Sequence, residues 1–128
     1  MDADVQFKGR VLVADDNEDL RDLMALQLGK LGVQVLLASN GAEALSVASR
    51  EAPDLILLDI EMPIMDGLEV ARQLRASGFN RSIVAVSAYR DNESLERICA
   101  AGCDDSVTKP VKLEELRTVL SGRLNLAD

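Results

Sequence analysis

The chain has 128 residues, 48% of them apolar, and a formal net charge of −8. This length fits one domain, and the apolar fraction suffices for a packed core, which argues against intrinsic disorder. The acidic balance argues against direct nucleic-acid binding, since that binding rests on neutralising phosphates with Lys and Arg. No apolar run approaches the roughly 20 residues that span a bilayer, and the N-terminus has no apolar signal segment. We therefore expect a cytoplasmic protein without direct membrane insertion.

In chain order, five short apolar segments alternate with helical patterns. The predicted strands are Arg10–Ala14, Val33–Ala38, Asp54–Leu58, Ser82–Ser87 and Ser106–Thr108. The strongest of these runs lack the alternation of half-exposed strands, which is typical of central parallel strands covered on both faces. Strands separated by helices of this length form right-handed βαβ units. The sequence therefore predicts an α/β fold with a doubly wound sheet of five parallel strands.

Between the strands, apolar residues recur at helical spacing. The stripes are Leu20, Leu23, Met24, Leu28 and Leu31; Ala44, Leu45 and Ala48; Leu68, Ala71 and Leu74; Leu95, Ile98 and Cys99; and Leu113, Leu116, Val119 and Leu120. We interpret each stripe as the core-facing side of a helix. The ends, Met1–Lys8 and Leu124–Asp128, are expected to be frayed or to lead into linkers. We predict a single domain over residues 1–128, with a core at about residues 8–123.

The chain has no histidine and two cysteines, Cys99 and Cys103. Two thiols cannot complete a tetrahedral zinc site, so we interpret both as reduced, mostly buried residues that share a helix face near its end. The absence of histidine excludes Ser-His and Cys-His nucleophiles. Any phosphohistidine chemistry must therefore be supplied by another protein.

Polar residues follow the predicted strands at the edge where doubly wound sheets bind ligands. Asp15 and Asp16 follow the first strand, Asp59 follows the third, Ser87 ends the fourth and Lys109 follows the fifth. Three carboxylates so close would repel one another unless a cation shared the site, and Mg²⁺ suits few carboxylates with several retained waters. An Asp carboxylate is a competent nucleophile for phosphoryl transfer, with Mg²⁺ and Lys109 neutralising charge and Ser87 donating a hydrogen bond.

Each of these residues has an ordinary interpretation when taken alone. Asp15-Asp16 suits a helix N-cap with a first-turn acid, Asp59 suits a turn, and Lys109-Pro110 is a common turn step. The joint placement at four strand ends favours the phosphoryl site.

The chain resembles the receiver domain of two-component response regulators. The matching segments, in the family's order, are Val11–Asn17, Asp54–Pro63, Met65–Gly67, Ala85–Ala88, Ala101–Asp105 and Thr108–Pro110. They span about residues 8 to 123, nearly the whole chain, and together they are far more specific than any one of them.

The resemblance implies a (βα)₅ receiver fold, similar to flavodoxin, with Asp59 as the phosphoacceptor. It makes Asp16 and Asp59 direct ligands of Mg²⁺, with Mn²⁺ as an alternative ion. Asp15 would hold the ion through water, and the backbone carbonyl of Glu61 would complete the protein ligands. Ser87 and Lys109 would contact the phosphoryl group.

The resemblance also implies a cis Lys109-Pro110 bond and a donor that is a histidine kinase or a histidine phosphotransfer protein. The domain would be a signalling module, not an enzyme in its own right, although it would catalyse its own phosphorylation and dephosphorylation. The output partner is not indicated. The parent could be a hybrid histidine kinase, a regulator with an effector domain, or a single-domain regulator.

One position departs from the family pattern. Most receivers have Tyr or Phe two residues before the Thr108-Lys109 step, and this chain has Ser106. We hypothesise that Tyr89 either shields the phosphoryl group or partly replaces the missing ring; the alternative is an exposed loop tyrosine. Glu61 and Tyr89 also flank the path by which water would attack the acyl phosphate, so their side chains should set its lifetime.

Three other functions are alternatives to a phosphoacceptor receiver domain. A phosphatase of the haloacid dehalogenase type needs a second Asp two residues after the nucleophile, where this chain has Glu61. A nucleotide-binding module needs a glycine-rich phosphate loop, and the chain has neither common form. A degenerate receiver that acts only by protein interaction typically lacks one of the key residues, all of which are present here.

Overall fold

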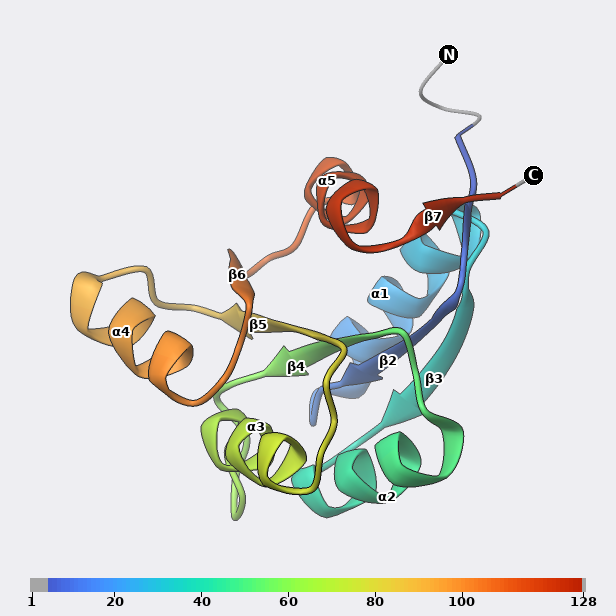
Figure 1. Cartoon of the computed structure of the whole chain (residues 1–128). Coiled ribbons are helices and arrows are strands. Elements are labelled where there is room, and N and C mark those ends of the chain that lie inside the picture. Colours follow the sequence, from blue (N-terminus) through green and yellow to red (C-terminus); the bar gives the residue numbers. More distant parts are fainter. Residues whose placement is uncertain (1–4, 128) are drawn as a thin grey trace.

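The computed structural model describes residues 5–127, and a five-stranded parallel sheet forms the centre of the fold (Figure 1). In spatial order its strands are β3 (Gln34–Ala38), β2 (Arg10–Ala14), β4 (Leu55–Asp59), β5 (Ser82–Ser87) and β6 (Asp105–Thr108). All five expected strands are found, with boundaries that differ by at most one residue. The predicted α/β fold with a five-stranded parallel sheet is confirmed.

Helices cover both faces of the sheet. The helices α1 (Glu18–Lys30) and α5 (Leu113–Arg123) pack on one face, and α2 (Gly41–Glu51), α3 (Gly67–Ala76) and α4 (Asn92–Ala100) pack on the other (Figure 1). Successive side chains of a strand point to opposite faces of the sheet and pack in two separate apolar clusters. Leu12 packs in the cluster with α2, α3 and α4, and Val13 packs in the cluster with α1 and α5. Every residue of β4 is buried, which explains its uninterrupted apolar sequence up to Asp59.

Side-chain caps fix where four of the described helices begin. Asn17, Asn40, Asp66 and Asp91 cap α1, α2, α3 and α4. Each side-chain oxygen accepts the backbone N–H three residues further on, at donor–acceptor distances of 2.8 to 3.2 Å. These bonds satisfy donors that a helix N-terminus otherwise leaves free. No helix within residues 5–127 is long and apolar enough to cross a membrane.

The two ends of the described chain pair with each other. The strands β1 (Phe7–Lys8) and β7 (Asn125–Leu126) form an antiparallel ribbon. The Phe7 side chain is buried in the cluster beneath α1 and α5. The expectation of frayed ends is therefore wrong for these four residues, because ladder hydrogen bonds and a buried ring hold them. It is also wrong for three flanking residues, because the N–H of Ala127 donates to the carbonyl of Gln6 at 2.9 Å and the N–H of Leu124 to the carbonyl of Leu120 at 2.8 Å. Residues 1–4 and 128, on which the expectation also falls, lie outside the described residues.

Most residues of the expected stripes are buried or half-buried, but three are not. Leu23 and Leu95 are 49% and 37% exposed, and Cys99 is also exposed. The prediction that these side chains face the core is wrong. Spacing identifies one side of a helix, but the width of the covered strip depends on how close the neighbouring elements lie.

The two cysteines do not share a helix face, contrary to the expectation. The helix α4 ends at Ala100, and Gly102 has a φ of 105°, which turns the chain before Cys103. Cys103 is buried in the loop that follows, and burial raises the pKa of its thiol to about 11. Both thiols are free, as expected.

Ile64, in the loop between β4 and α3, has a left-handed backbone with a φ of 70°, which a β-branched side chain disfavours. Its side chain is fully exposed, so its removal costs no packing. We expect Ile64→Gly to raise the free energy of unfolding by about 1 kcal/mol, because glycine adopts this φ without strain. Urea unfolding measures this difference. Ile64→Val keeps the branched Cβ and should match the wild type; a glycine variant no more stable than the valine variant would contradict the prediction.

Candidate functional site

Four strand ends meet at one edge of the sheet. Asp15 follows β2, Asp59 ends β4, Ser87 ends β5 and Lys109 follows β6. The parallel ladders that join these strands place their ends side by side. The backbone N–H of Lys109 donates to the carbonyl of Ser87 at 2.9 Å, and the Lys109-Pro110 bond is cis, as expected. The residues singled out in the sequence therefore lie together.

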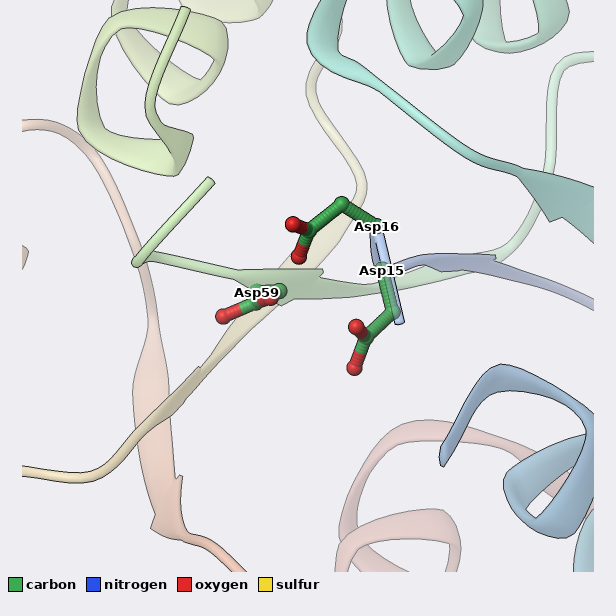
Figure 2. Close-up of side chains that lie close together, drawn as sticks. All are labelled: Asp15, Asp16 and Asp59. Atoms are coloured by element: carbon green, nitrogen blue, oxygen red, sulfur yellow. The ribbon is translucent and has the colours of Figure 1, made fainter. Parts of the chain in front are cut away.

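Three carboxylates form the acidic part of this edge. One oxygen each from Asp15, Asp16 and Asp59 lies within 4.8 Å of the others (Figure 2). Asp15 and Asp59 are buried, whereas Asp16 is exposed. Asp15 Oδ1 accepts the backbone N–H of Asn17 at 2.8 Å, and Asn17, not the acidic pair, caps α1. The N-cap interpretation of Asp15-Asp16 is therefore wrong, and both carboxylates remain available to the site.

Asp59 occupies the deepest position. Its Oδ1 lies 2.7 Å from Lys109 Nζ and accepts the backbone N–H of Glu61 at 3.1 Å. Its Oδ2 is buried and has no hydrogen-bond partner within the part of the chain that the structure describes. Burial raises the pKa of Asp59 to about 7; the bond and charge of Lys109 oppose this rise, and the negative charge of Asp15 adds to it.

Lys109 supplies the positive charge. Burial lowers the pKa of its ammonium group, but the hydrogen bond to Asp59 and the charges of Asp59, Asp15 and Glu61 outweigh this effect. The net pKa of Lys109 is raised, so it stays protonated. One ammonium faces three clustered carboxylates, which leaves the edge of the sheet with an excess of negative charge.

The donor set fits a hard divalent cation. A buried carboxylate oxygen without a partner, such as Asp59 Oδ2, is costly unless a cation or a proton pairs with it. The nearby donors are all oxygens, which suit Mg²⁺ or Mn²⁺ better than the softer transition metals. The acidic cluster could therefore bind a metal ion, as the sequence indicates.

The contacts of the Glu61 side chain were not predicted from the sequence; the expectation that this side chain sets the lifetime of the acyl phosphate stays a prediction. Its Oε2 accepts the Ser87 hydroxyl at 2.8 Å, and its Oε1 accepts the backbone N–H of Ala88 at 2.9 Å. Lys109 Nζ lies 3.9 Å from Oε1. The sequence analysis used only the backbone carbonyl of Glu61 as a ligand, and that assignment stays a prediction.

Gly67 allows α3 to begin directly against the end of β4. A Cβ at Gly67 would lie 2.3 Å from the backbone oxygen of Asp59 and 2.8 Å from the Cα of Ile60. The N–H of Gly67 donates to the carbonyl of Ile60 at 3.0 Å. Only glycine fits so close to a neighbouring backbone, which explains why it follows Asp66 here. This packing fixes the main chain that carries Asp59.

The positions of Ser106 and Tyr89 bear on the predicted switch. Ser106 is half-buried in β6, and the Tyr89 side chain is 58% exposed in the loop after β5. The backbone N–H of Tyr89 donates to Ser87 Oγ at 3.0 Å, so its main chain is tied to the site while its ring faces solvent. The hypothesis that this ring shields the phosphoryl group or replaces the missing aromatic stays a prediction.

Comparison with known proteins defines the class of protein to which this chain belongs. The family model of the response regulator receiver domain matches residues 11–121, and the chain therefore belongs to this family. It is a receiver domain of two-component systems, whose known role is to accept a phosphoryl group on an Asp. It is thus a signalling domain, and the phosphatase and nucleotide-binding alternatives are set aside.

Among its relatives, the chain is 44% identical over 109 residues to response regulator MprA of Mycobacterium leprae, which covers 84% of this chain and 47% of that protein. It is 39% identical over 111 residues to sensor histidine kinase RcsC of Salmonella typhi, covering 87% of this chain and 12% of that protein. The chain therefore spans about half of one relative and about an eighth of the other.

Solved structures agree with this assignment. Chemotaxis protein CheY4 of Vibrio cholerae superposes with a TM-score of 0.87 at 28% identity, over 91% of this chain and 99% of that chain. The receiver domain of the Francisella response regulator 1452 gives a TM-score of 0.83 at 29% identity, over 88% and 93%. The expected receiver fold is confirmed.

Proposed function

We propose that Asp59 is the phosphoacceptor of this receiver domain, and that the donor is the phosphohistidine of a histidine kinase or a histidine phosphotransfer protein. The observation that supports this most is Asp59 Oδ2, a buried carboxylate oxygen with no hydrogen-bond partner among the described residues. Its sister oxygen is bound by Lys109 and by the N–H of Glu61. The free oxygen is the one available to react.

The chemistry follows from these contacts. Asp59 Oδ2 attacks phosphorus, a new P–O bond forms, and the P–N bond to the donor imidazole breaks, with the electron pair leaving on nitrogen, which a proton then neutralises. Lys109 and the Ser87 hydroxyl stabilise the oxygens of the transferred group. A bound Mg²⁺, or Mn²⁺, would supply charge neutralisation for the same oxygens. Asp16, Asp59 and the Glu61 carbonyl would ligate the ion directly, and Asp15 would hold it through water.

The same geometry supports self-catalysis within a signalling role. The domain brings acceptor, charge and hydrogen-bond donor together, so the donor protein only has to present its phosphohistidine. We place the domain at residues 1–128 of a cytoplasmic protein. The hybrid kinase, the regulator with an effector domain and the single-domain regulator remain alternatives for the parent. The output partner is any protein that distinguishes the phosphorylated from the unphosphorylated state.

Intact mass spectrometry tests the acceptor. We expect the wild type, incubated with acetyl phosphate and Mg²⁺, to gain one labile phosphoryl group, and Asp59→Asn to gain none. Omission of Mg²⁺ should abolish the adduct in the wild type. Asp22→Asn, which removes an exposed carboxylate of α1, is the matched control and should react like the wild type.

A stable mass gain in Asp59→Asn would move the acceptor elsewhere. If the wild type gains no mass, its adduct can be too short-lived to detect. The test is then repeated with beryllofluoride, which mimics the phosphoryl group. Absence of Mg²⁺-dependent stabilisation by beryllofluoride as well would leave the interaction-only receiver as the better interpretation.

A further inference from the structure

The Glu61 carboxylate contacts the same two side chains, Ser87 and Lys109, that we propose for the phosphoryl group on Asp59. Its two oxygens accept the Ser87 hydroxyl at 2.8 Å and the Ala88 N–H at 2.9 Å. Lys109, which pairs with Asp59 at 2.7 Å, is 3.9 Å from the same carboxylate. A hydroxyl, a backbone N–H and an ammonium form an anion-binding cradle, and its present occupant is a side chain of the chain itself.

The inward position of the Glu61 side chain needs a specific cause. Glu61 lies in a loop, its side chain is 33% exposed, and it brings a fourth carboxylate toward three others. Like charges this close disfavour one another, and an exposed Glu would ordinarily extend into water. The three donors of the cradle are what hold it inward. An incoming phosphoryl group would compete for the same donors and would carry the same sign of charge.

We propose that Glu61 is a gate: its carboxylate fills the phosphoryl cradle in the unphosphorylated domain and must leave before a phosphoryl group binds at Asp59. This inference rests on the proposed function of Asp59. In the unphosphorylated domain the Ser87 hydroxyl donates to a carboxylate oxygen of Glu61, which takes the place of a phosphoryl oxygen. It therefore lowers the affinity of the site for tetrahedral anions without touching the acceptor oxygen Asp59 Oδ2.

A second position for the displaced side chain exists beside the cradle. A cavity of about 210 Å³ opens next to Ser87, and its lining includes Glu61, Tyr89, Ser94 and Arg97. Arg97 makes no ion pair closer than 4.0 Å with any of the described residues. The charge of Arg97 already acts on Asp91, and Asp66 also lines the cavity, so a Glu61 carboxylate that turns into the cavity would share the Arg97 guanidinium with these two carboxylates.

The expected effect follows from the population of the open position. When the binding-competent state is populated at about one tenth, the apparent affinity for the ligand falls about tenfold. The open position loses the two hydrogen bonds from Ser87 and Ala88 to the Glu61 carboxylate, and bonds to water replace them in part. The net cost is consistent with an open population of about one tenth. Removal of the gate should recover this factor.

Isothermal titration of beryllofluoride at saturating Mg²⁺ tests the gate in three proteins. We expect Glu61→Ala to bind about five- to tenfold more tightly than the wild type. Glu61→Asp keeps the charge on a side chain one methylene shorter, which withdraws the carboxylate from the cradle, and it should resemble Glu61→Ala. If Glu61→Asp binds beryllofluoride as weakly as the wild type, the negative charge at this position lowers the affinity without filling the cradle, and the proposal is overturned.

Nuclear magnetic resonance of the ligand-free protein gives a second readout. The Ala88 amide donates to a charged acceptor in the wild type, so its proton resonance should shift upfield in both Glu61→Ala and Glu61→Asp. An unmoved Ala88 amide would overturn the proposal. This measurement also separates two failures: if no protein binds beryllofluoride, the proposed function of Asp59 fails, and the Ala88 amide still decides whether Glu61 fills the cradle.

Arg97→Ala tests the second position. It should weaken beryllofluoride binding about two- to fivefold in the wild-type background, because the open position loses its cation, and should leave binding unchanged in the Glu61→Ala background. Equal effects in both backgrounds would overturn the assignment of Arg97 as the second partner of Glu61.

Discussion

Asp59→Asn is expected to be more stable than the wild type, by about 2 kcal/mol at about pH 8 in the absence of Mg²⁺. Burial raises the pKa of Asp59 from its ordinary value of 3.8 to about 7. The charged carboxylate is therefore less favourable in the folded protein than in the unfolded chain. Asparagine keeps the shape of the side chain and can still accept the N–H of Glu61, which lies 3.1 Å from Oδ1 in the wild type.

The sign of the pH dependence follows from the same shift. Between pH 3.8 and about 7 the folded protein binds more protons at Asp59 than the unfolded chain does, so the contribution of Asp59 to stability is greatest below this window and is lost as the pH rises through it. Each pH unit between the two pKa values corresponds to about 1.4 kcal/mol. The pKa of about 7 already includes the opposing effect of Lys109. An asparagine NH2 at the Oδ2 position would be buried without a partner, and this cost offsets part of the gain, which leaves about 2 kcal/mol.

Urea unfolding at several pH values measures the difference. The advantage of Asp59→Asn should shrink as the pH falls and vanish toward about pH 4. Added Mg²⁺ should stabilise the wild type more than Asp59→Asn, because the ion binds the folded state through the carboxylate that the variant lacks. Asp22→Asn removes an exposed charge and should stay within about 0.5 kcal/mol of the wild type. An Asp59→Asn variant less stable than the wild type at about pH 8 would show that the Lys109 ion pair outweighs the cost of burial.

The strands and the acidic edge were predictable because their signals are local. Five apolar runs end in polar residues, and parallel strands present their carboxyl ends at one edge, so the sequence alone places Asp15, Asp59, Ser87 and Lys109 together. The direction of the Glu61 side chain could not be predicted in this way. Its position two residues beyond β4 is visible in the sequence, but its direction depends on the loop after β5, which supplies the Ala88 N–H.

Other misses have a similar cause. The ribbon of β1 and β7 joins Phe7 to Leu126, and strands of two residues carry no periodic pattern. Leu23 and Leu95 have the spacing of core residues, but neighbouring elements do not reach far enough around α1 and α4 to cover them. Local sequence fixes which side of an element is apolar, whereas the extent of burial is decided by its neighbours.

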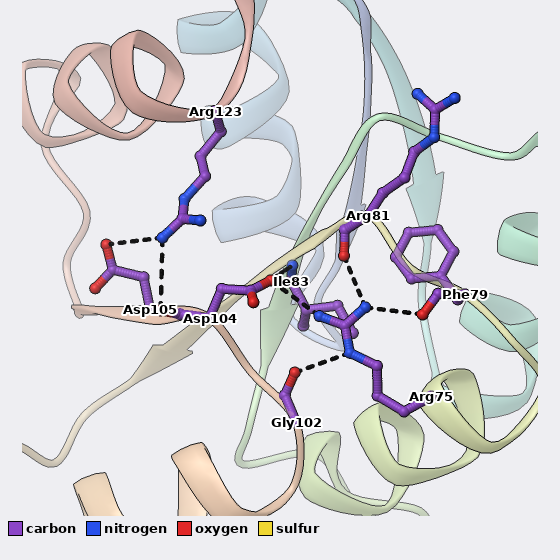
Figure 3. Close-up of polar contacts among 8 residues, drawn as sticks. All are labelled: Arg75, Phe79, Arg81, Ile83, Gly102, Asp104, Asp105 and Arg123. Carbon is purple, nitrogen blue, oxygen red and sulfur yellow. Dashed lines mark hydrogen bonds and ion pairs between the residues drawn. The ribbon is translucent and has the colours of Figure 1, made fainter.

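The largest loss of stability is expected from Arg75→Ala, by about 3 kcal/mol. Arg75, near the end of α3, ties three separate segments together (Figure 3). Its Nε donates to the carbonyl of Gly102 at 2.9 Å, and its Nη1 donates to the carbonyls of Phe79 at 2.9 Å and Arg81 at 2.7 Å. Its Nη2 bonds to Asp104 Oδ2 at 2.9 Å.

Truncation would remove every one of these donors at once. The carboxylate of Asp104 also accepts the N–H of Ile83 at 2.9 Å, so Arg75 and Asp104 together hold the start of β5 against the chain leading into β6. Arg75 is only 25% exposed, so water replaces its bonds incompletely. Arg75→Lys keeps the charge but cannot reproduce the planar fork, and should lose most of the same stability.

Arg72→Ala is the matched control on the same helix. Its ion pair with Glu69, at 3.3 Å, joins side chains that are 55% and 46% exposed, and such pairs contribute at most about 0.5 kcal/mol. Urea unfolding of Arg75→Ala, Arg75→Lys and Arg72→Ala measures the free energy of unfolding and compares the half-buried Arg75 with the exposed Arg72. If Arg75→Ala loses no more stability than Arg72→Ala, the contacts of Arg75 are replaced by water. The ordering of β5 against β6, and with it the spacing of Ser87 and Lys109, would then rest on the sheet ladder and the core alone.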